Sequence, residues 1–256
     1  MKKTRGSTSE HARNIRQQGH DDALEFAILI GVADAYTNDL KAKKDVVDKS
    51  GDAHSVKSGN KKWQIFLYGA NRFLKDESYQ AMNGMGQLLV ECINSFPLSF
   101  DEYSLNKSLY KEKLKPHMIK LQELLQSQNR VKSFFSKAIF NHGEVKYLTI
   151  KSDDIFHVFL NSDINTVFAE NLIVENSIKR SVASFDAQKV IFKYDGLNLA
   201  ELEMRNDTPI HYREIRFNMI KPRAMKLFFE KIPRQAKFSD RVHVYGNASK
   251  TFGRWK

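Results

Sequence analysis

Apolar positions in the first part of the chain recur mostly at intervals of three and four residues. This spacing is typical of one buried face of an α-helix. It predicts helices over residues 21–38, 61–75, 78–96 and 101–140.

From residue 144 onward the pattern changes to short apolar runs and to alternation of apolar and polar positions. Alternation with a period of two is typical of half-buried β-strands. It predicts strands over residues 145–150, 156–160, 190–194, 198–205 and 210–218, with a short helix over 163–172.

Residues 1–20 are polar and basic, and they are expected to form a flexible arm. The rest of the 256-residue chain, 21–256, is long enough to fold as one domain with a sizeable core.

Residues 45–58 predict a short β-hairpin. Val46 and Val47 favour a strand, and the Lys-Ser-Gly-Asp cluster after them favours a turn. Because side chains alternate along a strand, Ser55 and Lys57 share one face of the returning strand, with Asp45 opposite them. A carboxylate that holds a hard cation beside a lysine that steadies water or phosphate suits a metal-dependent phosphodiesterase.

Other interpretations of these residues remain open. A lysine between Ser and Gly is usual in a solvated turn, where Asp48 and Asp52 also fit without any metal. In a different register, either of these acids is the metal ligand. Glu25 lies in an apolar helix that Asp21 or Asp22 opens, so it needs a partner, a metal or a solvated edge.

A second hairpin is predicted over residues 198–218, with a turn near Pro209. A two-stranded ribbon fits the major groove of DNA, where arginine pairs with guanine and asparagine with adenine. The alternative is a solvated strand face on which Glu201 or Glu203 pairs across the strands with Arg213 or Arg216. The candidate DNA-contacting side chains on this hairpin are Arg205, Asn206, His211, Tyr212, Arg213 and Arg216.

The formal net charge is +11, which favours a polyanionic partner such as nucleic acid. No apolar run is long enough to span a bilayer, and residues 1–22 lack the apolar segment of a signal peptide. The single cysteine, Cys92, excludes an internal disulfide and fits a reducing cytoplasm.

The pattern Asp45 … Ser55-Val56-Lys57, after a helix carrying Glu25, resembles the PD-(D/E)xK nuclease superfamily. Within it the chain is similar to type II restriction endonucleases over 55–64 and 203–213. The resemblance implies an α/β fold: a mixed central β-sheet flanked by helices (a restriction-endonuclease-like core), with the active hairpin at the sheet edge and a strand-rich C-terminal half. It implies Mg²⁺-dependent, sequence-specific cleavage of double-stranded DNA.

The resemblance also implies roles for individual residues. Asp45 is the main metal ligand, Lys57 orients or activates the attacking water, and Glu25 is an auxiliary acid that also faces the metal. Ser55 marks the position where a second metal-binding acid often stands, and Lys44 replaces the usual proline before Asp45. Acids farther along the chain that could take the second position are Asp76 and Glu77, with Gln64 nearer.

The implied partners are double-stranded DNA, a second copy of the chain in a homodimer that cuts a short palindromic site, and a DNA methyltransferase encoded elsewhere. Lys61, Lys62 and Gln64 join the DNA-contacting candidates. Two rival functions remain: a DNA repair or nicking nuclease of the same superfamily, and a non-catalytic basic DNA-binding protein.

Overall fold

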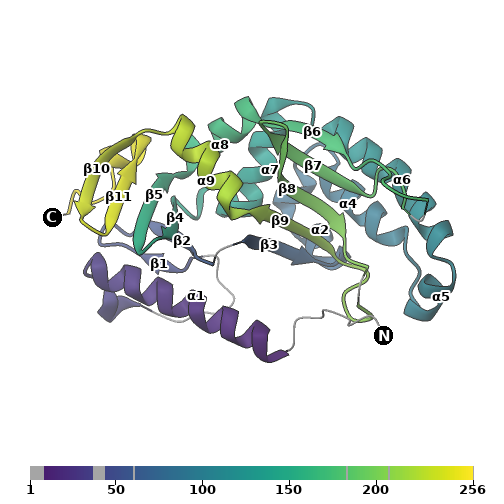
Figure 1. The fold of residues 1–256 in the computed structure, drawn as a ribbon, viewed down its shortest axis with the longest axis horizontal. Coiled ribbons are helices and arrows are strands. Elements are labelled where there is room, and N and C mark those ends of the chain that lie inside the picture. Colours follow the sequence, from purple (N-terminus) through teal and green to yellow (C-terminus); the bar gives the residue numbers. More distant parts are fainter. Residues whose placement is uncertain (1–8, 37–43, 60, 183, 207, 256) are drawn as a thin grey trace. The chain divides into compact units, whose positions relative to one another are not determined.

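The computed structural model describes the chain apart from residues 1–8, 37–43, 60, 183, 207 and 256. The chain divides into two compact units (Figure 1). Unit 1 comprises residues 1–60, 143–164 and 232–256, and unit 2 comprises 61–142 and 165–231.

Unit 1 contains a mixed β-sheet, which in the described residues has the strand order β1-β2-β4-β5-β11-β10. The pairs β2–β4 and β5–β11 are parallel, and the other neighbours are antiparallel. The expected α/β class with a mixed sheet is therefore confirmed. The elements of unit 1 are α1 (Ser9–Leu29), η1 (Ala33–Ala35), β1 (Val46–Val47), β2 (Ala53–Lys57), β4 (Tyr147–Ser152), β5 (Ile155–Leu160), β10 (Arg234–Ser239), β11 (Val242–Tyr245) and η3 (Gly246–Lys250).

Helix α1 covers one face of this sheet (Figure 1). The ring of Phe26 lies 5.0 Å from that of His54 and 5.3 Å from that of Phe156, and all three residues are buried. Phe252, which follows η3, closes the same cluster against His54 at 5.3 Å. Unit 1 thus has an aromatic core between α1 and the sheet.

Residues from Ser9 onward, which were expected to belong to a flexible arm over 1–20, form the first part of α1. Side-chain hydrogen bonds from Gln17 to Asp21 and from Gln18 to Asp22 join positions four apart, so they support the helix beyond the apolar stretch. Residues 1–8 lie outside the described part.

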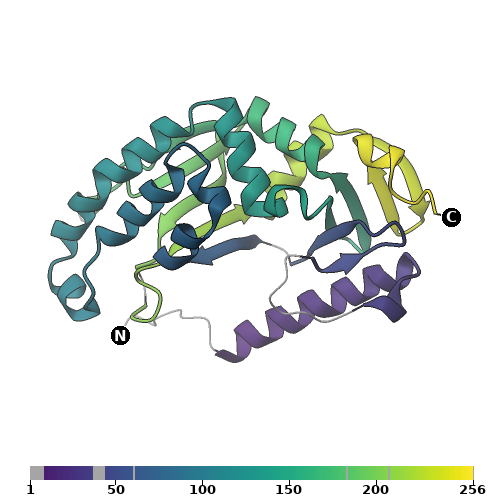
Figure 2. The ribbon, with the colours of Figure 1, turned by 180° about the vertical axis from the view of Figure 1, so that it is seen from behind.

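Unit 2 contains a second sheet that the sequence did not predict as separate. In the described residues its strands follow the order β3-β9-β8-β7-β6, with antiparallel neighbours throughout. Helices α4 (Met85–Asn94), α6 (Lys107–Leu124) and α7 (Gln128–Phe140) cover one face of this sheet (Figure 2). The strands are β3 (Lys62–Tyr68), β6 (Ile173–Asn176), β7 (Lys189–Tyr194), β8 (Leu197–Met204) and β9 (Ile215–Ile220).

Aromatic rings fill the space between these helices and the sheet, with Phe134 stacked at 5.7 Å on Phe192 and 5.0 Å from Phe217.

No helix in the described part of the chain is long and apolar enough to cross a membrane. The remaining helices are α2 (Ala70–Lys75), α3 (Glu77–Gln80), α5 (Phe100–Leu105), η2 (Asn141–Gly143), α8 (Asn161–Asn171) and α9 (Lys221–Lys231). Of these, η2 and α8 run across the divisions between the units.

The prediction of one helix over 61–75 is wrong, because strand β3 occupies its first half and α2 only its second. The register of β3 against β9 shifts between Gln64 and Phe66, as it does at a β-bulge. The extra residue brings Trp63 and Phe66, three positions apart, to buried positions. A bulged strand therefore imitates the spacing of a helix.

Candidate functional site

The predicted hairpin is present in unit 1, at the edge of the mixed sheet. Val46 of β1 pairs with His54 of β2, so Asp45 stands opposite Ser55. The turn between the strands is held by Asp48, whose Oδ1 accepts hydrogen bonds from the backbone N–H groups of Ser50 (2.8 Å) and Asp52 (3.1 Å). An aspartate that bonds its own following backbone fixes a tight turn, so the register is set locally.

Three of the four predicted active-site residues meet on one face of this hairpin. Oδ2 of Asp45 accepts the backbone N–H of Val56 at 2.7 Å and the Ser55 hydroxyl at 3.3 Å. Nζ of Lys57 lies 3.6 Å from the same oxygen. The Asp45 and Lys57 side chains keep 30% and 28% of their surface exposed, whereas Ser55 is buried. A carboxylate and a lysine are thus held together within reach of solvent.

A buried histidine, missed from the sequence, supports the hairpin on its opposite face. Nδ1 of His54 lies 2.9 Å from Oγ1 of Thr149, and its Nε2 lies 3.3 Å from Oδ2 of Asp48. His54 is fully buried, and this burial lowers its pKa although Asp48 opposes the shift. The six-residue spacing of Asp48 and His54 across a turn was the available signal, but Thr149 comes from a distant strand.

The fourth predicted residue, Glu25, contacts other groups. Oε2 of Glu25 lies 2.6 Å from Nζ of Lys151, and its Oε1 accepts a hydrogen bond from Arg241. Lys151 also binds Asp22 at 2.8 Å. Burial raises the pKa values of both acids, but their hydrogen bonds and the positive charge of Lys151, with Arg241 at Glu25, together outweigh it, so both pKa values are lowered.

Side-chain alternation separates the two groups of residues. On β4, Lys151 has the parity of Tyr147, whose ring stacks at 4.6 Å on His54 under α1. Lys57 has the opposite parity to His54 on β2, so it faces away from α1. The structure therefore places Glu25 and Lys57 on different faces of the sheet.

The alternative acids have structural partners. Asp52 binds Lys146 at 2.6 Å, and Asp48 holds the turn as described. Asp76 caps α3 in unit 2 and binds Lys137 at 2.9 Å, and Glu77 is the first residue of that helix. Within the described residues, no group of three or more His, Cys, Asp or Glu side chains is arranged to hold a metal ion.

Mg²⁺ does not require such a group, because it keeps several waters and binds through one or two carboxylates together with substrate phosphates. Asp45 supplies a partly exposed carboxylate, and the neighbouring Ser55 hydroxyl is also a hard oxygen donor. This donor set fits the implied ion.

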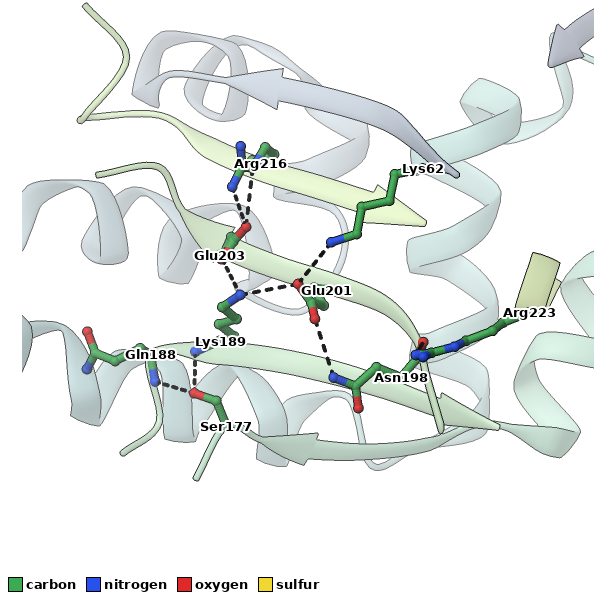
Figure 3. A network of polar contacts seen from close by, with 9 residues as sticks. All are labelled: Lys62, Ser177, Gln188, Lys189, Asn198, Glu201, Glu203, Arg216 and Arg223. Carbon is green, nitrogen blue, oxygen red and sulfur yellow. Dashed lines mark hydrogen bonds and ion pairs between the residues drawn. The ribbon is translucent and has the colours of Figure 1, made fainter. Parts of the chain in front are cut away.

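The second predicted hairpin is also present, in unit 2, as β8 and β9 joined by residues 205–214. Charged side chains from four strands form a network on one face of its sheet (Figure 3). Glu203 binds Arg216 at 2.6 Å and Lys189 at 2.7 Å. Glu201 binds Lys189 at 3.2 Å and lies 3.9 Å from Lys62. The cross-strand pair Glu203–Arg216 is the alternative that the sequence had left open.

The other DNA-contacting candidates lie mainly in the connecting loop. Tyr212 is buried, and its hydroxyl donates to the carbonyls of Pro97 (2.9 Å) and Leu98. Tyr212 therefore anchors the loop. Of the remaining candidates, Arg213 donates to Asn94 at 2.9 Å, His211 lies 2.8 Å from Glu214, Arg205 and Asn206 are half-buried, and Lys61 and Gln64 are exposed.

Comparison of the chain with protein-family models, with curated proteins and with solved structures gave no match.

Proposed function

We propose that the chain is a Mg²⁺-dependent endonuclease that hydrolyses phosphodiester bonds of double-stranded DNA, in the manner of a type II restriction endonuclease. The observation that carries this proposal is the meeting of Asp45, Ser55 and Lys57 on one partly exposed face at the edge of a mixed sheet. The finer likeness to a restriction-endonuclease core belongs to the same proposal.

Each residue then has a definite task. A bound Mg²⁺ supplies positive charge to the scissile phosphate and lowers the pKa of water. Asp45 provides its carboxylate ligand, and Val56 N–H fixes the orientation of that carboxylate. Lys57, held 3.6 Å from Asp45, orients the attacking water or stabilises the negative charge of the phosphate. Ser55 fills the second-acid position without supplying a charge.

The formal charge of +11 supports DNA as the substrate, since basic side chains gain affinity by releasing counterions from phosphates. A homodimer, a palindromic site and a partner methyltransferase follow from the resemblance alone. Lys61, Lys62, Gln64 and the loop of the second hairpin are the proposed DNA contacts of unit 2.

A second candidate is a non-catalytic DNA-binding protein. It is favoured by the hydrogen bonds of Asp45, because a carboxylate that receives Val56 N–H and the Ser55 hydroxyl stabilises the hairpin without any metal. Binding by such a protein falls steeply with salt and needs no divalent cation.

The test is incubation of the purified protein with sequenced, unmethylated phage or plasmid DNA, with Mg²⁺ or with EDTA, followed by electrophoresis. Discrete Mg²⁺-dependent fragments are expected, and sequencing their ends gives the site. A smear or nicked circles would favour a repair-type nuclease. DNA that is retarded but intact, with or without EDTA, would favour the non-catalytic DNA-binding protein.

The residues are tested in the same assay. Asp45→Asn and Lys57→Ala are expected to abolish cleavage while DNA binding persists. Lys49→Ala is the matched control, because it removes an exposed lysine from the turn of the same hairpin. Full cleavage by the Lys57→Ala protein would exclude the assigned role.

A further inference from the structure

The last segment of unit 1 carries an excess of positive charge. Between residues 232 and 255 five basic residues stand against a single acid, Asp240, which gives a net charge of +4. One of the five, Arg241, donates a hydrogen bond to the carboxylate of Glu25. The other four are exposed, and we name them the basic edge: Arg234, Lys237, Lys250 and Arg254.

The basic edge lies on one part of the unit. Arg234 and Lys237 are on β10, the outermost strand of the described sheet. A cavity of about 150 Å³ is lined by Lys237, Ser249 and Gly253 together with apolar groups. Lys250 and Arg254 directly follow Ser249 and Gly253 along the chain, so their backbone is close to this cavity.

Aromatic side chains hold this segment on the unit 1 core. Phe252 is buried and lies 5.2 Å from Phe238 and 5.2 Å from Trp255. A Cβ at Gly253 would lie 2.6 Å from the Phe238 ring, so only glycine permits this close packing. The charges therefore stand on a fixed support.

In the described part of the chain, acidic side chains neutralise little of the basic edge. Asp240 is fully exposed and lies 3.9 Å from Lys237, and surface pairs of this kind contribute little. The pKa of buried His243 is lowered, first by its burial and then by the charges of Arg234 and Lys237. Its Nε2 is buried and makes no hydrogen bond among the described residues.

The spacing and composition suit a DNA backbone. Arg234 and Lys237 are three residues apart, about 10 Å along a strand, which is the axial length of about three phosphates on one DNA strand. The exposed stretch 233–237 has no large apolar side chain to bury in a lipid surface, which favours DNA over a membrane.

We propose that the basic edge is a second DNA-contacting surface, which binds the phosphate backbone of duplex DNA without sequence preference. It stands on its own observations and does not require cleavage. Lys57 is on β2, and β10 lies four strand intervals away at the far edge of the sheet. This separation is about 19 Å, so the surface would contact the duplex about six base pairs from a bond bound at Lys57.

The test is a titration of a labelled duplex of about 30 base pairs in EDTA, followed by fluorescence anisotropy between about 50 and 200 mM KCl. The variant Arg234→Gln/Lys237→Gln/Lys250→Gln/Arg254→Gln is expected to lower the slope of log Kd against log salt by about 3 to 4, at about 0.9 per lost phosphate contact. The control Lys107→Gln/Lys113→Gln/Lys120→Gln/Lys132→Gln loses equal charge from exposed positions of α6 and α7, and its slope should change by less than about 1.

Equal slope changes in the two variants would overturn the proposal, because net charge alone would explain binding. An unchanged slope in the basic-edge variant would also overturn it, leaving the charges to prevent edge-to-edge strand pairing. Loss of binding to anionic vesicles with no change in the DNA slope would assign the surface to a membrane and overturn it as well.

Failure of the proposed nuclease is separately visible. A reduced salt slope together with wild-type protein that never cuts DNA with Mg²⁺ would support the basic edge and contradict the nuclease. Mg²⁺-dependent cleavage by the wild type, together with an unchanged salt slope in the basic-edge variant, would support the nuclease and contradict the basic edge. Circular dichroism melts of both variants check folding, since all eight side chains are exposed.

Discussion

At the scale of single residues, the hairpin in unit 1 has a different environment on each of its faces. Asp45 and Lys57 face partly toward solvent, while His54 is enclosed by rings of the core. Glu25 belongs to the enclosed side, where Lys151 and Arg241 hold it. The proposed active-site residues therefore lie on one face of the hairpin, and the residues that support it lie on the other.

The change Glu25→Gln distinguishes the auxiliary-acid role from an ion-pair role. Because Lys151 and Arg241 would lose their partner, we expect the free energy of unfolding to fall by about 1–3 kcal/mol, with cleavage per folded molecule retained. Urea denaturation and the phage DNA assay measure the two quantities. A large loss of cleavage at unchanged stability would restore the auxiliary-acid role.

His54 gives the protein a pH dependence of known sign. Its pKa is lowered in the folded state by burial, so below the unfolded value of 6.5 the unfolded chain binds more protons than the folded one. Stability should therefore decrease as the pH falls from 6.5 toward the lowered pKa. Thermal melts of wild type and His54→Gln across this window test it, and the variant should show a shallower dependence. Equal slopes would contradict the assignment.

At the scale of elements, the hairpin of unit 1 depends on one turn. Gly51 in this turn has φ +82°, a left-handed conformation that other residues adopt with strain. A Cβ there would meet nothing within 4 Å, so the cost of substitution is conformational only.

Gly51→Ala is therefore expected to destabilise the protein by about 1 kcal/mol. Gly19→Ala is the matched control, because Gly19 is also free of contacts but lies inside α1. There alanine should stabilise by about 0.5–1 kcal/mol. Denaturant titration of both variants checks the opposite signs, and two changes of the same sign would disagree with the turn geometry.

The sequence predicts correctly those features that depend on interactions between residues close together in the chain. The hairpin over 45–58 was predicted correctly because its strands and turn are adjacent in the chain. Residues 61–75 were assigned wrongly because a bulge depends on pairing with β9. The partners of Glu25, and the division of the chain into two units, depend on contacts between distant segments, which no local pattern contains.

At the scale of the whole molecule, each unit carries its own part of the proposed activity. Unit 1 holds the hairpin and the basic edge, and unit 2 holds the second hairpin. Cleavage of both DNA strands then depends on two copies of Lys57, one from each subunit of the proposed homodimer.

A mixture of wild type with excess Lys57→Ala protein tests this arrangement. Mixed dimers should cut one strand only, so open circles of a supercoiled plasmid carrying the site should accumulate above the level given by wild type alone. Agarose gels after subunit exchange measure the ratio of open to linear DNA. Linear product alone would contradict a dimer that cuts one strand per subunit.

The discontinuity of unit 1 also has a consequence for its biosynthesis. The hairpin leaves the ribosome early, yet Phe252, which packs against His54, comes from the segment 232–256, made after both parts of unit 2. A nascent chain folds from its N-terminal side. The hairpin therefore lacks the packing of Phe252 until that segment leaves the ribosome. For a nuclease, this order delays activity until translation has passed Phe252, and prematurely terminated chains would leave the cell's own DNA intact.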